Sequence, residues 1–247
     1  MTKLFPFLFA AAIAGTCSRD LPYPIEQFET PAGDAVSVAM IHHGSLALSY
    51  KGFHIQIDPV AKMGGTEIDY TCFPKADLIL VTHEHGDHLD PAAIDLLSKD
   101  GTRILLNPAS QAKLGRGEAV SNGDTLRVGP VGIIAVPAYN ISEDHLQFHP
   151  KGRDNGYILD FDGLRIYVSG DTEDIDEMAG FGPLDVAFLS ANQPYTMTTT
   201  QCVEAAMTLQ PKVLIPYHLS DTDMQEIKTV LDTNDSGIEV RLFEELR

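Results

Sequence analysis

The sequence predicts a layered α+β fold in which two β-sheets pack face to face and helices cover their outer surfaces. Short apolar segments rich in β-branched residues recur in two runs, and helical segments follow each run. The 247 residues suit one domain with a substantial core, and neither a short-period repeat nor a segment left over for a second domain is visible. We therefore expect a single folded domain over residues 36–247.

Apolar segments of strand length indicate the sheets, and Lys51-Gly52 and Asp162-Gly163 are typical of the tight turns that join neighbouring strands. The expected strands are residues 36–41, 46–50, 53–57, 78–81, 104–106, 131–136, 157–161, 164–168, 186–189 and 213–215.

The helices are recognised by the residues at their starts. Two begin with proline at the first helical position, one of them directly behind Asn107. Thr198 and Thr222, each with glutamine three residues further on, fit capping boxes for two more. The expected helices are residues 91–99, 108–114, 198–209 and 222–231.

The N-terminal segment is expected to be an export leader over residues 1–17. Lys3 supplies a positive start, and the apolar residues 4–14 are too few to span a bilayer as a helix. Cleavage after Ala14 and lipidation of Cys17 are two alternatives, and they place the protein in the bacterial periplasm or on a membrane through a lipid anchor. Residues 18–35, which contain prolines and a glycine, are expected to form an extended tether.

Charge and cysteine content exclude some classes of function. The chain has 17 basic and 35 acidic residues, a formal net charge of −18, which repels nucleic acid. Three cysteines are too few for a disulfide framework, and Cys72 and Cys202 are expected to be buried thiols. Nucleic acid is therefore not an expected partner; a small-molecule substrate is expected instead.

Six consecutive residues carry the most informative pattern in the chain. Residues 77–81 are typical of a buried strand, and soon after them come His83-Glu84-His85-Gly86-Asp87-His88. Imidazole nitrogens and carboxylate oxygens bind zinc-type ions, and two histidines two residues apart can turn onto one ion where a strand opens into a loop. Asp87 and His88 then face a second position nearby. No packing requirement explains this composition, so the pattern predicts a metal site.

Thr82-His83-Glu84-His85-Gly86-Asp87-His88 resembles the signature loop of the metallo-β-lactamase superfamily, and three other segments resemble further motifs in the same order. They are Ile55-Gln56-Ile57-Asp58-Pro59, Ile166-Tyr167-Val168-Ser169-Gly170-Asp171-Thr172 and Val213-Leu214-Ile215-Pro216-Tyr217-His218. The resemblance extends from about Val36 to His218 and is nearest to the ascorbate-6-phosphate-lactonase-like branch of metal-dependent hydrolases. It implies a four-layer αββα sandwich, which agrees with the layered fold expected from the strand and helix pattern.

The resemblance also implies two divalent metal ions. The implied ligands are His83, His85 and His149 on one ion, Asp87, His88 and His218 on the other, and Asp171 shared by both. These nitrogen and oxygen donors favour Zn²⁺, with Mn²⁺ or Fe²⁺ as alternatives.

Two of these ligand assignments have alternatives. His149 lies in a segment that resembles the lactonase-like branch and is favoured over His145 as the third histidine of the first ion. Asp171 follows a strand, from whose end it can bridge both ions, but it could instead cap a helix over residues 172–179. Asp58 is expected to orient a ligand or the metal loop.

The expected reaction is hydrolysis of a lactone or a phosphoester, with Asp87 and Asp171 as catalytic residues. Two divalent ions bring the pKa of a bridging water down to about 7, so hydroxide is available at neutral pH. A β-lactamase-type amide hydrolase and a non-catalytic metal-binding lipoprotein of the same fold are alternatives. Residues expected to contact the substrate are His43, which could instead be a structural histidine, Tyr139, Asn140, Lys151, Asn192 and Tyr195.

Overall fold

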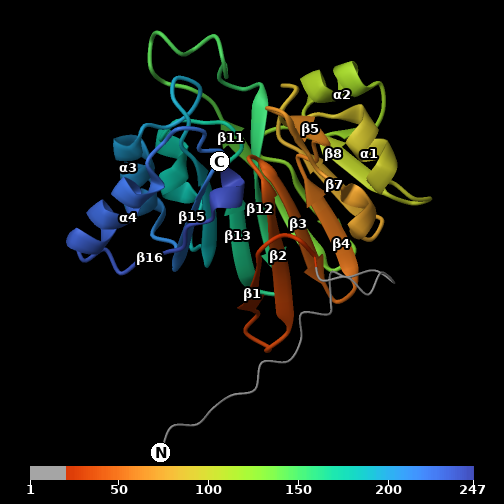
Figure 1. Ribbon diagram of the computed structural model, residues 1–247, viewed down its shortest axis with the longest axis horizontal. Coiled ribbons are helices and arrows are strands. Elements are labelled where there is room, and N and C mark those ends of the chain that lie inside the picture. Colours follow the sequence, from red (N-terminus) through yellow and green to blue (C-terminus); the bar gives the residue numbers. More distant parts are fainter. Residues whose placement is uncertain (1–20) are drawn as a thin grey trace, which may run out of the picture.

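The computed structural model describes residues 21–247, and the expected leader over residues 1–17 lies outside them. Two sheets face each other at the centre of the molecule, with α1 and α2 outside the first sheet and α3 and α4 outside the second (Figure 1). This is the four-layer αββα arrangement that the sequence predicts. Among the described residues, no helix is both long and apolar enough to cross a membrane.

The first sheet has seven strands within the described residues, and a two-stranded hairpin lies apart from it. Strands β1 to β4 pair antiparallel, whereas β4, β7, β8 and β9 pair parallel. In sheet order the strands are β1 (Ile25–Glu29), β2 (Ala35–His42), β3 (Ser45–Tyr50), β4 (Phe53–Ile57), β7 (Leu78–Val81), β8 (Arg103–Leu106) and β9 (Glu118–Ala119), and the hairpin is β5 (Lys62–Met63) and β6 (Thr66–Glu67).

The second sheet, also seven-stranded in the described part of the chain, repeats this pattern, with antiparallel pairs first and parallel pairs after them. Its strands are β10 (Thr125–Val128), β11 (Val131–Ala138), β12 (Asp154–Phe161), β13 (Leu164–Val168), β14 (Val186–Ser190), β15 (Val213–Tyr217) and β16 (Glu239–Val240). Because β2, β4 and β7 point the same way in one sheet, and β11, β13, β14 and β15 do so in the other, their carboxyl ends gather at one edge of each sheet.

The helices begin close to their predicted positions. They are α1 (Pro91–Leu97), α2 (Pro108–Leu114), α3 (Thr199–Leu209) and α4 (Met224–Thr233), with the 3-10 turns η1 (Tyr70–Cys72), η2 (Asp176–Gly180) and η3 (Glu244–Leu246). The capping box at Thr198 is confirmed, because its hydroxyl accepts from the Gln201 amide and the Gln201 side chain accepts in return. The one at Thr222 is wrong, because Asp223 caps α4 and accepts from the Gln225 amide. A carboxylate one position later replaces the threonine as the cap.

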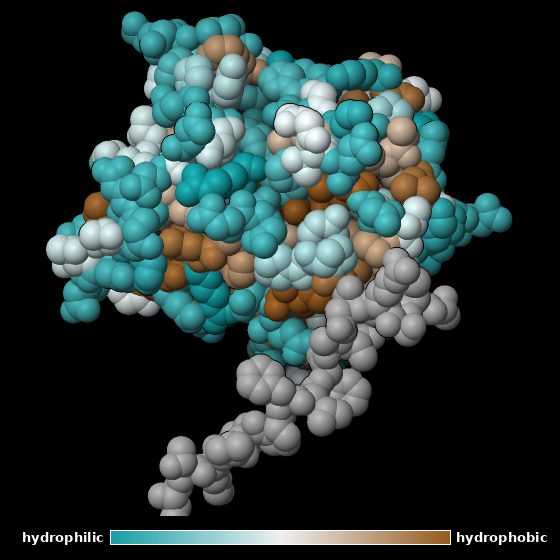
Figure 2. All heavy atoms as spheres, in the orientation of Figure 1, coloured by the Kyte–Doolittle hydropathy of each residue, from teal (hydrophilic) through white to brown (hydrophobic). Residues whose placement is uncertain are grey.

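Apolar side chains fill the spaces between all four layers. The central cluster lies between the sheets and includes Leu80 and Ile133. A second cluster joins α1 to the first sheet, and a third joins α3 and α4 to the second sheet. Hydrophilic side chains cover most of the face in Figure 2, and hydrophobic ones show between them mainly near the middle.

The expected tether over residues 18–35 is wrong for the segment Ile25–Glu29. This segment forms strand β1 and pairs along its whole length with β2, from Ile25 opposite Ala39 to Glu29 opposite Ala35. Its backbone is extended, as the prolines around it favour, but the sheet edge binds it. The folded domain therefore begins before Val36.

Candidate metal centre

Five loops bring the candidate ligands to the edge where the strand ends gather. His43 lies in the turn from β2 to β3, and the residues from His83 to His88 follow β7. His149 lies in the loop between β11 and β12, Asp171 follows β13, and His218 follows β15. The fold therefore places residues from five distant parts of the sequence around one point.

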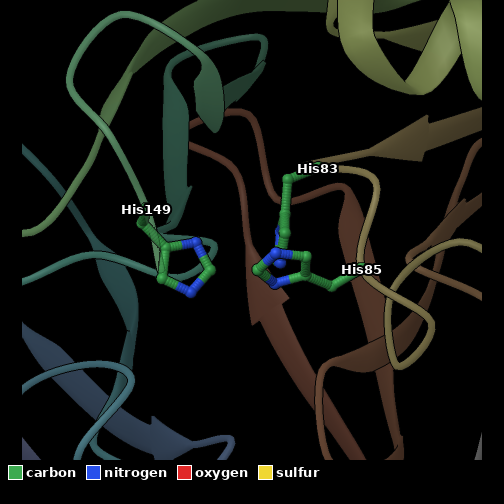
Figure 3. Close-up of side chains that lie close together, drawn as sticks. All are labelled: His83, His85 and His149. Carbon is green, nitrogen blue, oxygen red and sulfur yellow. The ribbon is translucent and has the colours of Figure 1, made fainter. Parts of the chain in front are cut away.

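The first group consists of His83, His85 and His149. One ring nitrogen from each lies within 4.8 Å of the others. In Figure 3, His83 and His85 come from one loop, and His149 faces them across a gap from another. The ring centroids of His85 and His149 are 4.9 Å apart. This is the set of three that the resemblance implied for the first ion.

The second group contains a residue that was not expected there. His43, Asp87 and His218 place donor atoms within 4.8 Å of one another. Asp87 Oδ2 is 3.6 Å from His43 Nε2 and 3.5 Å from His218 Nε2. His43 was expected to touch substrate or to serve as a structural histidine. The sequence His42-His43-Gly44-Ser45 contains no pattern that marks His43 as a metal ligand.

Asp171 lies between the two groups. Its Oδ2 is 3.4 Å from both His149 Nε2 and His218 Nε2, and its Oδ1 is 3.4 Å from His88 Nε2. The alternative role as a helix cap is wrong, because the next helical turn, η2, begins only at Asp176 and is capped by Ile175. The position of Asp171 is the one expected for a shared ligand.

Four buried donor and acceptor atoms at this point have no hydrogen-bond partner in the described part of the chain. They are Nε2 of His83, His88 and His218, and Oδ1 of Asp171. Leaving one buried polar atom without a partner costs about 1–3 kcal/mol, so several together need an explanation. Cations bound between them would supply the missing partners, and the residues present therefore fit a metal site.

The far sides of the histidine rings are held by hydrogen bonds. His88 Nδ1 lies 2.8 Å from Asp58 Oδ2, and His149 Nδ1 lies 3.0 Å from Asp154 Oδ2. His83 Nδ1 lies 3.0 Å from the Thr82 hydroxyl. Such partners fix which ring nitrogen faces a metal. Asp58 takes the orienting position that the sequence indicated.

Burial and charge leave His83, Asp171 and Asp87 in forms that bind cations, whereas Asp171 and Asp58 outweigh burial at His88 and raise its pKa well above its ordinary value. Burial lowers the pKa of His83 well below its ordinary value, and the neighbouring His88 adds to the effect. Burial acts to raise the pKa of Asp171, but His218 and His88 outweigh it and hold that pKa well below its usual range. The pKa of Asp87 is also lowered, because the neighbouring His218 and His43 rings outweigh the effect of burial. Neutral imidazole and ionised carboxylate are the ligand forms.

The loop between β11 and β12 separates the roles of its two histidines. His145 Nδ1 lies 3.2 Å from Glu173 Oε1, and the same carboxylate accepts from the amides of Ile141 and Ser142. His145 thus ties the loop to the second sheet, whereas His149 points at the metal groups. This geometry favours His149 as the third histidine.

A cavity of about 430 Å³ opens beside the metal groups. Of the expected substrate contacts, only His43, Asn192 and Tyr195 line it. Three lining residues were not predicted, because nothing in the local sequence marks Met63, Phe148 or Ser220 as part of a binding cavity. The lining residues are His43, Met63, His85, Asp87, Phe148, His149, Asp171, Asn192, Tyr195, His218 and Ser220.

The other expected contacts lie outside the cavity lining. Lys151 donates to the Tyr139 hydroxyl and to Glu177, both at 2.8 Å, so this pair forms a surface cluster with Glu177. Tyr139 and Lys151 therefore do not line this cavity, and their contact with substrate stays a prediction. Asn140 lies beneath the cavity wall and donates to the backbone oxygen of Tyr195 at 2.8 Å. It supports the wall without lining the cavity.

Comparison with known proteins defines the class. Residues 37–218 match the beta-lactamase superfamily domain, and the chain belongs to that family. It is a metal-dependent hydrolase of the metallo-β-lactamase superfamily.

Three similar proteins show how far this likeness extends. A UPF0173 metal-dependent hydrolase from Thermococcus kodakarensis is 36% identical over 153 residues, 58% of this chain and 67% of the relative. The crystal structure of a candidate metal-dependent hydrolase from Parabacteroides distasonis is 50% identical with a TM-score of 0.87, and the match covers 91% of this chain and all of that one. Igni18, a metallo hydrolase from Ignicoccus hospitalis, is 25% identical with a TM-score of 0.70 over 86% of this chain and 96% of its own.

Proposed function

We propose that this chain hydrolyses a lactone or a phosphoester with two divalent metal ions. The observation that carries the proposal is the convergence of unpartnered buried atoms of His83, His88, His218 and Asp171 between two ligand groups. His83, His85 and His149 would hold one ion, and Asp87 and His218 the other, with Asp171 shared. The third position on the second ion has two candidates: His88, whose Nε2 is 3.9 Å from Asp87 Oδ2, and His43, whose Nε2 is 3.6 Å from it. The abundance of imidazole favours Zn²⁺, and Mn²⁺ or Fe²⁺ also suit these donors.

Two such ions, when bound, lower the pKa of a water and polarise the oxygen of the bond to be cleaved. The remaining work belongs to side chains of the protein. Asp58 and Asp154 hold the His88 and His149 rings in place through their Nδ1 atoms. Asn192, whose Nδ2 is 3.5 Å from His218 Nδ1, faces the cavity and can orient a substrate oxygen.

Metal content and turnover on the same preparation test the proposal. The purified protein, stripped with a chelator and reloaded with Zn²⁺ or Mn²⁺, should bind close to two equivalents by elemental analysis. It should then hydrolyse members of a panel of lactones, phosphodiesters and β-lactams, and the chelator should abolish the activity. One equivalent at saturation contradicts the two-ion assignment. Two equivalents with no turnover of any substrate would instead support a metal-binding protein of the same fold.

Export is a separate proposal that rests on the leader alone. The apolar residues 4–14 behind Lys3, followed by Cys17, support transfer to the bacterial periplasm or anchoring by a lipid. Fractionation of cells expressing the full chain, together with a Cys17→Ala variant, tests it. If Cys17 is lipidated, the wild-type chain should stay in the membrane fraction and the Cys17→Ala variant should be lost from it. Recovery of both forms in the cytosol with intact leaders contradicts export.

A further inference from the structure

Part of the cavity lining is apolar and aromatic. Met63 reaches it from the β5–β6 hairpin, Phe148 from the loop before His149, and Tyr195 from the segment between β14 and α3. Phe148 and Tyr195 form an edge-to-face pair with centroids 4.9 Å apart, and Tyr195 is 45% exposed. Three distant segments thus build one surface on which an apolar group can rest.

Hydrogen bonds to its backbone hold this wall in place. Asn140 Nδ2 donates to the Tyr195 oxygen at 2.8 Å, and the Tyr195 amide donates to the Asn192 oxygen at 2.9 Å. Asn140 is itself buried, so its amide has little freedom to turn away. The backbone that carries Tyr195 is therefore held without a ligand, which reduces the ordering cost of binding.

No lysine or arginine lines the cavity among the described residues. The two nearest along the chain to His149 are already paired. Lys151 lies 2.8 Å from Glu177, and Arg153 makes a 2.6 Å contact with the fully buried Asp154. The carboxylates that line the cavity are Asp87, whose side chain is 34% exposed, and the buried Asp171.

Away from the metal ligands, an anionic group on the non-reacting part of a substrate would meet no lysine or arginine among the described residues that line this cavity. Recognition of phosphate or carboxylate in proteins relies on charge-assisted hydrogen bonds from arginine or lysine, and none is offered here. The net charge of −18 also opposes the approach of anions. A neutral apolar group meets neither cost and gains contact with Met63, Phe148 and Tyr195.

We infer that the substrate is a lactone or carboxylic ester whose non-reacting part is an uncharged alkyl or aryl group bound against Met63, Phe148 and Tyr195. This inference rests on the proposed hydrolase function and narrows it to neutral carbonyl substrates. In the reaction, water adds to the carbonyl carbon and the acyl C–O bond breaks. The leaving oxygen takes up a proton, so a lactone yields its hydroxy acid.

A homologous series of γ-lactones on the metal-loaded protein tests the inference. As the alkyl substituent lengthens from none to six carbons, kcat/KM should rise about twofold to fourfold per buried methylene, mainly through KM. A lactone with a phosphate at the end of the same chain should react at least tenfold more slowly than its neutral counterpart. The Kd of 2-alkylcyclopentanones, which bind but cannot be hydrolysed, should fall with chain length in the same way.

Three variants locate the effect. Tyr195→Ala and Phe148→Ala should flatten the dependence of kcat/KM on chain length. Leu96→Ala removes a similarly exposed apolar side chain from α1, outside the cavity, and should leave both that dependence and the rate on unsubstituted γ-butyrolactone unchanged. Tyr195→Lys should raise the relative rate on the phosphate-bearing lactone, because it supplies the missing cation.

The outcomes separate this inference from the proposed function. Metal-dependent turnover that prefers phosphodiesters or the phosphate-bearing lactone overturns the inference and leaves the two-ion hydrolase standing. Lactone turnover without any dependence on chain length also overturns it. Absence of metal-dependent hydrolysis across the whole panel overturns the proposed function and the inference with it.

Discussion

Replacing Asp58 with alanine should weaken both the fold and the binding of metal, because one buried carboxylate supports two parts of the site. Asp58 is fully buried after β4. It accepts from the amide and the hydroxyl of Thr82, both at 2.7 Å, and lies 2.8 Å from His88 Nδ1. The backbone of the metal loop and the orientation of one ligand ring thus depend on it.

The magnitude follows from the groups that alanine leaves without a partner. The buried Thr82 amide loses its partner, whereas His88 Nδ1 keeps the Thr82 hydroxyl at 3.4 Å. One orphaned buried group costs about 1–3 kcal/mol, so the free energy of unfolding should fall by at least that amount. Asp58 also has a positive φ of 44°, which alanine tolerates less well than aspartate or asparagine. Loss of a partner that orients a ligand commonly lowers metal affinity about 10–100-fold.

Two measurements and two companion variants separate these effects. Urea unfolding of the metal-free protein reports stability, and competition with a chromophoric chelator reports the affinity for Zn²⁺. Asp58→Asn keeps the volume and the tolerance for positive φ, so it should lose less stability and still lose metal affinity. Asp223→Ala removes the cap of α4, and should cost about 0.5–2 kcal/mol with no effect on metal. Wild-type metal affinity in Asp58→Ala would refute the role given to this carboxylate.

Three further predictions concern other residues. His149→Ala should remove about one equivalent of metal and abolish turnover, whereas His145→Ala should keep the metal and lose only loop stability. Elemental analysis of both variants tests this. The reverse pattern would show that the third histidine is His145. Asp171→Ala should abolish hydrolysis while the protein stays folded, since the shared ligand lies between both groups; near-normal turnover with a lowered melting temperature would contradict this. Burial lowers the pKa of the half-buried His54 below its ordinary value of 6.5. As the pH falls below 6.5, the unfolded chain therefore binds a proton at this residue before the folded chain does. The free energy of unfolding should decrease as the pH drops through this range. Urea midpoints at pH 7.5 and 5.5 should therefore differ less in His54→Gln than in the wild type, and equal differences would exclude this contribution.

Local patterns were enough to predict the layers of the fold. The continuous apolar stretch of β7 reflects a strand buried on both faces, and proline or a capping side chain marks the start of each helix. Such signals depend only on neighbours in the sequence, which is why they survive without a structure. They fail where partners are distant, as at Ile25–Glu29, whose strand exists because β2 offers it an edge.

The metal loop is the part of the site that the sequence by itself determined. From His83 to His88, the donors are adjacent in the chain, so their composition alone indicates a metal site. Only the tertiary structure decided the rest. In the folded protein, His43 lies beside Asp87, and Lys151 pairs with Glu177 outside the cavity. His145 contacts Glu173, whereas His149 faces the metal groups. These outcomes depend on strand register and on the path of long loops, which no pattern among neighbouring residues encodes.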